Sequence, residues 1–243
     1  MTETKFKLEY TETKTDKILP VIVVAAGNST RMAGINKQFA EIGGIPVIVR
    51  TLLQFENSEY ISRIIVVTKP DNILGIQSLA EQYNISKLSD VICGGNTRQE
   101  SVANGLERLE SNETNVLIHD GARPFVDGEI ISLVALALEN YKAVTCAVKV
   151  KDTIKQIDQT GLVIKTVPRE SLVSVQTPQG LNVSDYKNAI EKIGDISAFT
   201  DDTSIMEAAG YEVFTVPGSY KNFKITTPED MFIAEAYLKE ENL

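Results

Sequence analysis

The chain has 243 residues, of which 43% are hydrophobic and 23% are charged. These values are typical of a globular protein, so neither a disordered nor a fibrous chain is expected. The formal net charge of −9 argues against a broad cationic surface for DNA or RNA, because phosphate neutralisation supplies most of that affinity. No apolar run approaches the roughly 18 residues of a membrane span, and residues 1–17 lack the apolar core of a secretory signal. We therefore expect a cytoplasmic protein without nucleic-acid or membrane partners.

Two cysteines and one histidine restrict the possible chemistry. Cys93 and Cys146 lie far apart in apolar, strand-like segments, which favours two buried thiols in a reducing compartment over a disulfide. His119 is the only histidine, so a Cys/His zinc site or a pair of haem ligands cannot form within one chain. If His119 and Asp120 lie on one strand, their side chains point to opposite faces, which disfavours a His–Asp dyad. Nothing in the setting of His119 calls for titration, so we interpret it as structural.

Short apolar runs alternate with amphipathic stretches along most of the chain. Strands are predicted at residues 21–25, 64–68, 91–93, 116–119, 144–150 and 212–216. Helices are predicted at residues 47–55, 73–83, 97–109, 128–140, 183–192, 201–209 and 228–238. Strands that are apolar on both faces and separated by helices indicate a mostly parallel sheet. We predict one doubly wound α/β domain over residues 18–243, preceded by an extension, residues 1–17, that is either an edge strand or a polar segment.

Residues 151–168 interrupt this alternation. Two β-like runs, 153–157 and 162–167, flank Asp158-Gln159-Thr160-Gly161, which has the composition of a hairpin turn. The segment forms either an edge hairpin of the main sheet or a projecting arm. Its outward residues are unusually apolar for a solvated hairpin, which favours the arm.

A loop of small residues and cations follows the first predicted strand. It reads Ala25-Ala26-Gly27-Asn28-Ser29-Thr30-Arg31-Met32, with Lys37 shortly behind it. Open α/β sheets bind ligands at this end of a strand, and small residues let backbone N–H groups approach a phosphate. Neither the dinucleotide fingerprint nor the Walker A pattern is present. The loop is therefore either another kind of phosphate-binding loop or a tight turn with surface cations.

With Lys37-Gln38-Phe39, this loop resembles the signature of the sugar nucleotidyltransferases, in the form found in the 2-C-methyl-D-erythritol 4-phosphate cytidylyltransferase family. Further matching motifs occur in the family's order: Gly94-Gly95-x-x-Arg98-x-x-Ser101-Val102, His119-Asp120-Gly121-Ala122-Arg123-Pro124, Asp152-Thr153-Ile154-Lys155, Arg169 with Gln176-Thr177-Pro178-Gln179, Thr200-Asp201-Asp202, and Asn222-x-Lys224-Ile225-Thr226. The similarity runs from about residue 18 to residue 238. The chain departs from the family at Asn96, where Asp is common, and at Pro168, where an acidic residue is common.

The resemblance implies a Rossmann-like nucleotidyltransferase that joins CTP to a methylerythritol phosphate and releases pyrophosphate, in the non-mevalonate route to isoprenoid precursors. It also implies a homodimer in which the arm crosses to the second subunit, and Mg²⁺ or another divalent cation as cofactor. A ribitol-5-phosphate cytidylyltransferase and a non-catalytic nucleotide-binding module are the alternatives. The attacking phosphate oxygen is already ionised at pH 7, so the reaction needs cations rather than a general base.

Roles for individual residues follow from the same resemblance. The implied catalytic residues are Arg31, Lys37, Arg169 and Lys224. The implied nucleotide-binding residues are Ala25, Ala26, Gly27, Gly95, Asn96, Ser101, Asp120 and Gly121. The implied residues for the second substrate are Arg123, Thr153, Thr177 and Thr200. Mg²⁺ would be held mainly by the CTP phosphates, with Asp120 as a possible ligand.

Local chemistry adds three interpretations. Thr97 and Glu100 have the spacing of a helix capping box, which leaves Ser101 available for a ligand. Asp201 and Asp202 are interpreted as the charged start of a helix rather than as a metal site. Finally, the cations of the implied site would gather around one cleft, so that local potential rather than net charge governs the binding of anions.

Overall fold

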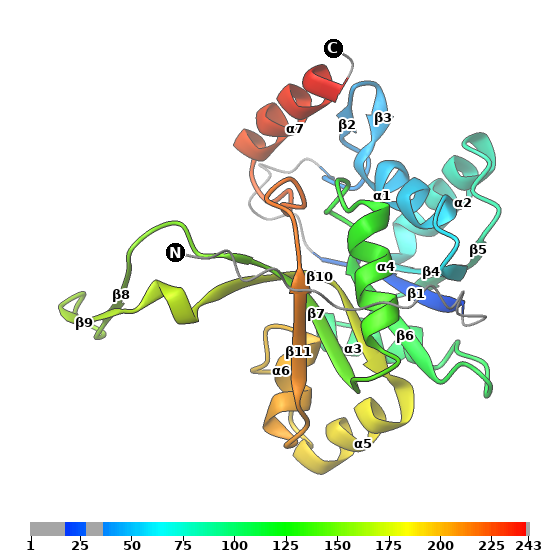
Figure 1. The fold of residues 1–243 in the computed structure, drawn as a ribbon. Helices are drawn as coiled ribbons and strands as arrows, with labels where there is room; N and C mark the ends of the chain where they lie inside the picture. Colours follow the sequence, from blue (N-terminus) through cyan, green and yellow to red (C-terminus); the bar gives the residue numbers. More distant parts are fainter. Residues whose placement is uncertain (1–17, 28–35, 242–243) are drawn as a thin grey trace.

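A seven-stranded sheet with the order β11-β7-β10-β6-β1-β4-β5 forms the centre of the molecule (Figure 1). The computed structural model describes residues 18–27 and 36–241. The strands are β1 (Leu19–Val24), β4 (Ile61–Thr68), β5 (Leu88–Cys93), β6 (Asn115–Asp120), β7 (Ala143–Lys149), β10 (Val173–Asn182) and β11 (Val213–Pro217). Neighbouring strands run parallel except β10, which is antiparallel to both β6 and β7. The predicted mostly parallel α/β fold is therefore confirmed.

Helices cover both faces of this sheet. Val21 and Val23 of β1 face a core shared with α1 (Val47–Glu56), α2 (Ile73–Gln82) and α4 (Gly128–Ala137). Ile22 faces the opposite core, shared with α3 (Arg98–Leu106), α5 (Val183–Ile193) and α6 (Asp202–Ala208). Successive strand residues point to opposite faces, so the uninterrupted apolar run of β1 fills both cores.

The sequence pattern did not predict β10. Its segment contains Pro178 and Gly180, and both residue types weaken a strand pattern. The Thr177–Pro178 peptide bond is cis, and the pairing of β10 with β7 shifts between Val175 and Gln179. A Cβ at Gly180 would lie 2.7 Å from Leu138 Cδ1, so the glycine lets α4 and the residues after it pack closely on β10.

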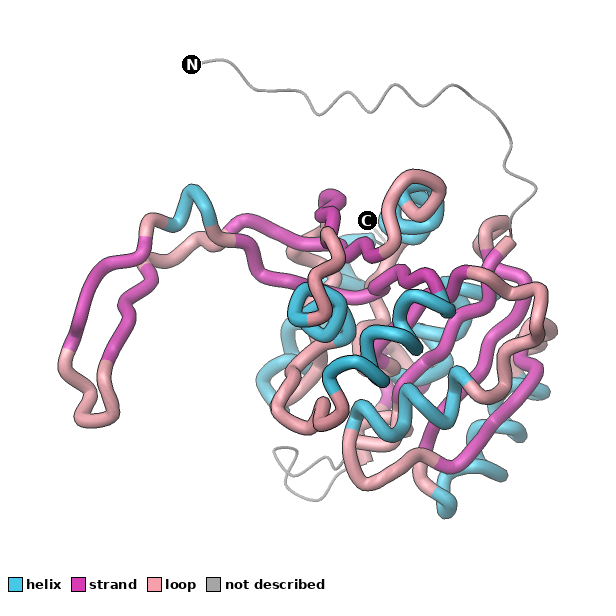
Figure 2. Tube along the Cα trace, turned by 90° about the horizontal axis from the view of Figure 1, so that it is seen from below, coloured by secondary structure: helices cyan, strands magenta, loops and turns pink. Residues whose placement is uncertain are grey.

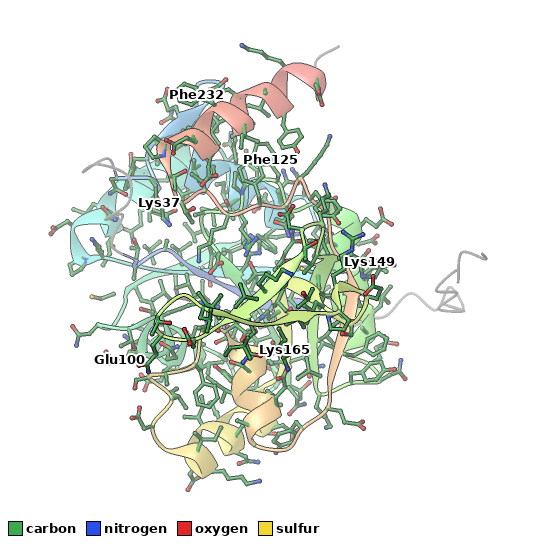
Figure 3. All side chains as sticks on the ribbon, turned by 90° about the vertical axis from the view of Figure 1, so that its left-hand side faces the viewer. Lys37, Glu100, Phe125, Lys149, Lys165 and Phe232 are labelled. Carbon is green, nitrogen blue, oxygen red and sulfur yellow. The ribbon has the colours of Figure 1, made fainter. Side chains whose placement is uncertain are left out.

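A smaller unit packs at one end of the sheet. It consists of the hairpin β2 (Glu41–Ile42) and β3 (Ile45–Pro46) and the last helix, α7 (Pro228–Glu241). Ile42, Val47, Ile225 and Ala234 form its buried cluster, and Phe125 packs against them beneath α7 (Figure 3). The start of α7 is capped by Asp230 Oδ2, which accepts hydrogen bonds from the backbone N–H groups of residues 226 and 227.

The predicted hairpin is present as a separate two-stranded sheet. β8 (Ile154–Ile157) pairs antiparallel with β9 (Val163–Val167), followed by the 3₁₀ turn η3 (Arg169–Ser171). With the outer ends of β7 and β10, these strands form an arm that projects from the body (Figures 1 and 2). At its tip, Asp158 Oδ1 accepts hydrogen bonds from the backbone N–H groups of Thr160 and Leu162. The turn is thus fixed by the side chain of its first residue.

The two cysteines differ in environment. Cys146 lies buried in β7, and burial raises the pKa of its thiol to about 12. Cys93 is exposed, so the prediction of two buried thiols is wrong for this residue. It ends the edge strand β5, where only one neighbouring strand is available to cover it. Among the described residues, no helix is both long enough and apolar enough to cross a membrane.

Candidate active site

A cavity of about 500 Å³ opens at the carboxyl ends of β1, β4 and β5. Each strand leads into a segment that lines it, which is where ligands bind in open α/β sheets. The lining residues are Ala26, Gly27, Thr68, Lys69, Pro70, Cys93, Gly94, Gly95, Asn96, Thr97, Arg98 and Ser101. They include five of the predicted nucleotide-binding residues: Ala26, Gly27, Gly95, Asn96 and Ser101.

The glycine turn after β5 depends on close backbone packing. A Cβ at Gly94 would lie 2.5 Å from Ala26 Cβ and 2.7 Å from Ser101 Oγ, so only glycine fits there. Ser101 lines the cavity, and its Oγ accepts a hydrogen bond from Gly95 N (3.1 Å) and donates one to Thr97 O (2.9 Å). The hydroxyl therefore holds the turn in place, a role that the sequence did not indicate.

The start of α3 forms the far wall of the cavity. Thr97 is the N-cap residue, and its side chain accepts a hydrogen bond from Glu100 N (3.1 Å). Glu100 Oε2 reaches back to Asn96 N (2.7 Å), one residue before the cap. The predicted capping interaction is thus present in a shifted form, and it fixes the backbone of Asn96 at the cavity rim.

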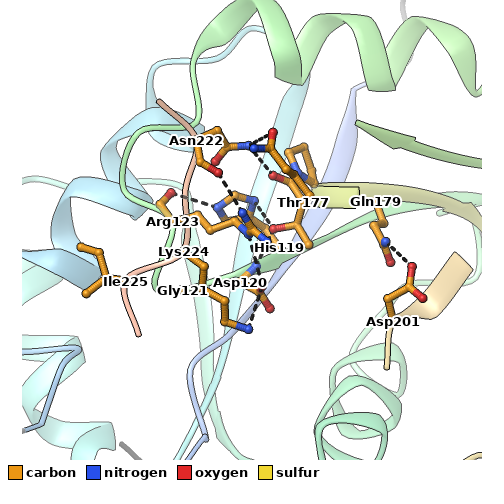
Figure 4. A network of polar contacts seen from close by, with 12 residues as sticks. His119, Asp120, Gly121, Arg123, Thr177, Gln179, Asp201, Asn222, Lys224 and Ile225 are labelled. Carbon is orange, nitrogen blue, oxygen red and sulfur yellow. Dashed lines mark hydrogen bonds and ion pairs between the residues drawn. The ribbon is translucent and has the colours of Figure 1, made fainter. Parts of the chain in front are cut away.

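Three cations surround the carboxylate of Asp120, at the end of β6. Figure 4 shows two of them, Arg123 and Lys224. Lys224 Nζ lies 3.0 Å and Arg123 Nε 3.3 Å from Oδ2, whereas Arg98 Nε lies 3.7 Å from Oδ1. Burial opposes ionisation of Asp120, but the charges of Lys224, Arg98 and Arg123 outweigh it and hold the pKa of the carboxyl well below its usual range. Asp120 is therefore a permanent anion that orders cations at the edge of the sheet.

The residues beneath Asp120 fix its backbone. Thr177 Oγ1 accepts a hydrogen bond from Asp120 N (3.0 Å) and lies 3.1 Å from His119 Nδ1. His119 is fully buried, its Nε2 lies 3.2 Å from Arg123 O, and its ring meets Phe55 edge to face. Burial lowers the pKa of His119 to about 3, so the imidazole is neutral at physiological pH. The interpretation of His119 as structural is confirmed.

The segment before α7, which carries Lys224, also contacts Arg123 and Lys37. Asn222 O accepts a hydrogen bond from Arg123 Nη1 (2.8 Å), and Ile225 N donates one to Ala122 O (2.8 Å). Lys37 Nζ donates to Ile225 O at 3.4 Å, next to Lys224 in the chain. Segments that are far apart in the sequence thus bring Lys37, Arg123 and Lys224 to the same edge of the sheet.

Ala25 and Gly121 support this edge from within. Ala25 is buried and donates its N–H to Val67 O (2.7 Å), while Gly121 N donates to Val24 O (2.9 Å). A Cβ at Gly121 would lie 3.1 Å from Ile48 Cδ1 and 3.2 Å from Ala25 Cβ. Gly121 therefore ties the end of β6 to β1, and Ala25 ties the end of β1 to β4.

Arg98 is a site residue to which the sequence assigned no role. Its Nη2 donates a 2.6 Å hydrogen bond to Oδ2 of Asp202, which is completely buried at the start of α6. Burial disfavours the charged guanidinium, but Asp202 and Asp120 outweigh this and raise the pKa of Arg98 above its ordinary value. Asp202 is more than the charged helix start that we expected, because its carboxylate is half of a buried ion pair. Arg98 belongs to the motif Gly94-Gly95-x-x-Arg98, which was the only signal in the sequence that pointed to it.

Several predicted residues lie apart from Asp120. Arg169 and Thr153 are exposed on the arm, where Arg169 Nη1 donates to Lys151 O (2.8 Å). Thr200 is exposed just before the N-cap of α6. Within a single chain, Arg169 does not join Arg123 and Lys224 beside Asp120, since the arm carries it outward. Arg31 lies outside the described residues.

A metal ion at this site would have few protein ligands among the described residues. Nowhere in residues 18–27 and 36–241 do three His, Cys, Asp or Glu side chains group as a metal site. Asp120 nevertheless has an ionised carboxylate 3.7 Å from Arg98, which lines the cavity. This arrangement fits an ion held mainly by ligand phosphates with one protein carboxylate, as is usual for Mg²⁺.

Comparison with known proteins gives a consistent result. Residues 19–240 match the family model described as 2-C-methyl-D-erythritol 4-phosphate cytidylyltransferase. A curated relative of that name from Halalkalibacterium halodurans is 48% identical over 223 residues, covering 90% of this chain and 96% of the relative. A relative of the same name from Clostridium novyi is 43% identical over 221 residues, covering 90% and 95%. The crystal structure of 4-diphosphocytidyl-2C-methyl-D-erythritol synthase from Anaerococcus prevotii is similar with a TM-score of 0.82 at 34% identity, covering 92% of this chain and 96% of that one.

Proposed function

Because this chain belongs to the 2-C-methyl-D-erythritol 4-phosphate cytidylyltransferase family, we propose that it transfers the cytidylyl group of CTP to 2-C-methyl-D-erythritol 4-phosphate. The products are 4-diphosphocytidyl-2-C-methyl-D-erythritol and pyrophosphate. The family match favours this reaction over transfer to ribitol 5-phosphate and over a non-catalytic nucleotide-binding role.

The chemistry suits a site rich in cations. A phosphate oxygen of the methylerythritol phosphate attacks the α-phosphorus of CTP, a new P–O bond forms, and the bond to the β-phosphate breaks with its electron pair leaving on pyrophosphate. No proton transfer is required, which agrees with a site whose only imidazole is buried and neutral. The barrier arises from bringing two polyanions together and from charge that develops at the α-phosphoryl group.

The observation that carries the proposal is the group of cations around Asp120, next to the cavity after β1 and β5. In this proposal Ala25, Ala26, Gly27, Gly95, Asn96 and Ser101 surround the base and ribose. Lys37 and Lys224, together with Arg31 from outside the described residues, stabilise the phosphates in the transition state. Arg guanidinium forks suit phosphate oxygens in pairs, and Lys acts as a compact charge, so the two are not interchangeable.

A divalent cation, most simply Mg²⁺, completes this proposal. When bound it would neutralise phosphate charge, and Asp120 is the residue of this chain that would contact it. The carboxylate is kept ionised by its cationic neighbours, so it needs no deprotonation to serve as a ligand.

The arm supports a proposal for the second substrate. Ile157, Leu162, Val163 and Ile164 are 52–69% exposed, a cluster of apolar side chains that is unusual for a solvated hairpin. A homodimer in which each arm covers the other subunit would bury them. It would also bring Arg169 and Thr153 to the partner's site, where with Arg123, Thr177 and Thr200 they would bind the methylerythritol phosphate. A cytoplasmic location likewise remains a prediction.

The experiment is a substrate comparison with the purified protein. CTP and Mg²⁺ are incubated with methylerythritol phosphate or with ribitol 5-phosphate, and released pyrophosphate and the cytidine diphosphate product are measured. Product with methylerythritol phosphate is expected. Efficient turnover of ribitol phosphate alone would contradict the substrate, and CTP binding without product from either would favour the non-catalytic module.

A further inference from the structure

Asp202 is a buried carboxylate outside the set of residues expected to touch substrate. It is fully buried at the first position of α6, and both of its oxygens have partners. Tyr186 OH donates to Oδ1 (2.8 Å) and Arg98 Nη2 donates to Oδ2 (2.6 Å). Asp202 N in turn donates to Gln179 Oε1 (3.0 Å), which anchors the helix start to β10. A buried charge held this firmly fixes whatever it is paired with.

Arg98 lies between two carboxylates but is firmly bound to only one. Its contact with Asp202 is a 2.6 Å hydrogen bond, whereas its Nε is 3.7 Å from Asp120 Oδ1, beyond hydrogen-bonding distance. Its Nη1 is buried and has no hydrogen-bond partner in the described part of the chain. If Arg98 were not held by Asp202, its guanidinium would approach Asp120 more closely and Nη1 would gain a hydrogen-bond partner. The position of Arg98 is therefore set by Asp202.

The two oxygens of Asp120 differ as a result. Oδ2 is close to both Lys224 Nζ (3.0 Å) and Arg123 Nε (3.3 Å). Among the described residues, Oδ1 has only the longer approach of Arg98. Oδ1 is thus the oxygen with no close cation, and it lies on the side of Arg98, which lines the cavity.

We propose that Asp202 is a positioning residue of this active site: it holds Arg98 away from Asp120, so that Oδ1 of Asp120 stays accessible to the bound nucleotide. This rests on the proposed function, because it takes the ligand that Asp120 faces to be CTP together with its divalent cation. Without the charge of Asp202, the guanidinium would close onto Oδ1 and compete with the nucleotide for it.

The first test is the isosteric variant Asp202→Asn, with Tyr186→Phe as its matched control. Each change weakens one hydrogen bond at Asp202, but only the first changes the partner of Arg98. The dissociation constant for CTP with Mg²⁺ is measured by calorimetry, with kcat, KM and the melting temperature. Asp202→Asn should weaken CTP binding about 10- to 100-fold, the usual effect of losing a group that orients a ligand-binding residue. Tyr186→Phe should lower the melting temperature and leave CTP binding within about twofold. Equal effects of both variants on CTP binding would reduce Asp202 to a folding residue and overturn the proposal.

A double-mutant cycle with Arg98→Met tests whether Asp202 acts through Arg98. The double variant Arg98→Met/Asp202→Asn removes both buried charges, so it avoids leaving either one unpaired. If Asp202 acts only through Arg98, the double variant should bind CTP within about twofold of Arg98→Met alone. Losses that multiply would contradict the proposal. A crystal structure of Asp202→Asn in which Arg98 stays 3.7 Å from Asp120 would also contradict it.

Measuring binding separately from turnover keeps the two proposals apart. If the wild-type protein binds CTP but forms no product with any polyol phosphate, the proposed reaction fails while the binding comparison still decides the role of Asp202. If the wild-type protein turns over but Asp202→Asn binds CTP normally, only the role of Asp202 fails. If the wild-type protein does not bind CTP, both fail.

Discussion

The surroundings of Asp120 and the projecting arm both carry predicted site residues, but they are built in opposite ways. Around Asp120, side chains from β6, from the start of α3 and from the segment before α7 contact one another within a single chain. On the arm, Arg169 contacts the backbone of Lys151, and Thr153 is exposed to solvent. The residues around Asp120 are therefore pre-organised by the fold of one chain, whereas the arm carries Arg169 and Thr153 outward, away from them.

This difference has an energetic meaning. Pre-organised cations need no rearrangement when charge develops, which is why such groups contribute strongly to catalysis. Exposed residues on an arm gain fixed positions only if association buries the apolar side chains around them. Substitutions near Asp120 and substitutions on the arm should therefore impair activity in distinguishable ways.

The largest effect is expected for Lys37→Ala. Lys37 reaches the segment that carries Lys224, and in the proposed mechanism its charge stabilises the transition state. Turnover should fall about 10²- to 10³-fold, the scale of other groups that stabilise developing charge. Steady-state kinetics measure this, with Lys142→Ala as the control, because Lys142 is exposed and pairs with Asp185 at the far end of β7. Near-normal turnover in Lys37→Ala would remove this residue from the mechanism.

The next effect tests whether the arm serves a second subunit. Lys37→Ala and Arg169→Ala chains with different affinity tags are co-expressed, and the mixed dimers are purified by both tags. If arms cross, one of the two sites combines an intact body with an intact arm, so about half of wild-type activity should return from two inactive parents. If each arm serves its own body, both sites stay defective. Activity no higher than that of the parents would therefore contradict arm exchange.

Regions with regular apolar patterns could be predicted from the sequence. The runs that became β1, β4, β6 and β7 fill both cores, and such strands cannot easily form anything else. β10 could not be predicted, because Pro178, Gly180 and two glutamines interrupt the apolar pattern of a strand. Its close packing on α4 depends on tertiary structure. The exposure of Cys93 followed from the position of β5 at the sheet edge, and strand order is a property of the whole fold.

Site residues within a recognisable motif could be predicted from the sequence. Those whose role depends on tertiary contacts could not. Asp120, Arg123 and Lys224 were identified by resemblance, and the structure brings them together. The pairing of Arg98 with Asp202 joins residues that are 104 positions apart, so no local pattern could reveal it. The hydroxyls of Ser101 and Thr177 hold backbone groups, a role that depends on atoms of neighbouring strands and turns.

A smaller effect is expected on the pH dependence of stability, and it arises at His119, next to Asp120. The pKa of His119 is about 3 in the folded protein and close to 6.5 when unfolded. Between these values the unfolded chain binds a proton that the folded chain does not, so stability falls as pH falls below 6.5. From pH 7.5 to pH 5, His119 should remove about 2 kcal/mol from the free energy of unfolding.

Urea denaturation at the two pH values, compared with His119→Asn, measures this contribution. The variant lacks the only histidine, so its stability should change about 2 kcal/mol less across the interval. An equal pH dependence in both proteins would show that the imidazole is not kept neutral by the fold. The arm contains no histidine, and the effect therefore reports on the body alone.

The smallest effect separates local folding from pre-organisation of the cavity. Thr97 and Asp127 are both N-cap residues whose side chains accept a hydrogen bond from the backbone three residues on, but only Thr97 lines the cavity. Replacing either with Ala should cost about 1 kcal/mol of stability. Only Thr97→Ala should also raise KM for CTP, because the α3 start then frays beside Asn96, and Thr97→Ser should restore it. Thermal unfolding and CTP kinetics on these variants test this, and equal changes in KM for Thr97→Ala and Asp127→Ala would mean that the cap acts through global stability, not through the geometry of the nucleotide site.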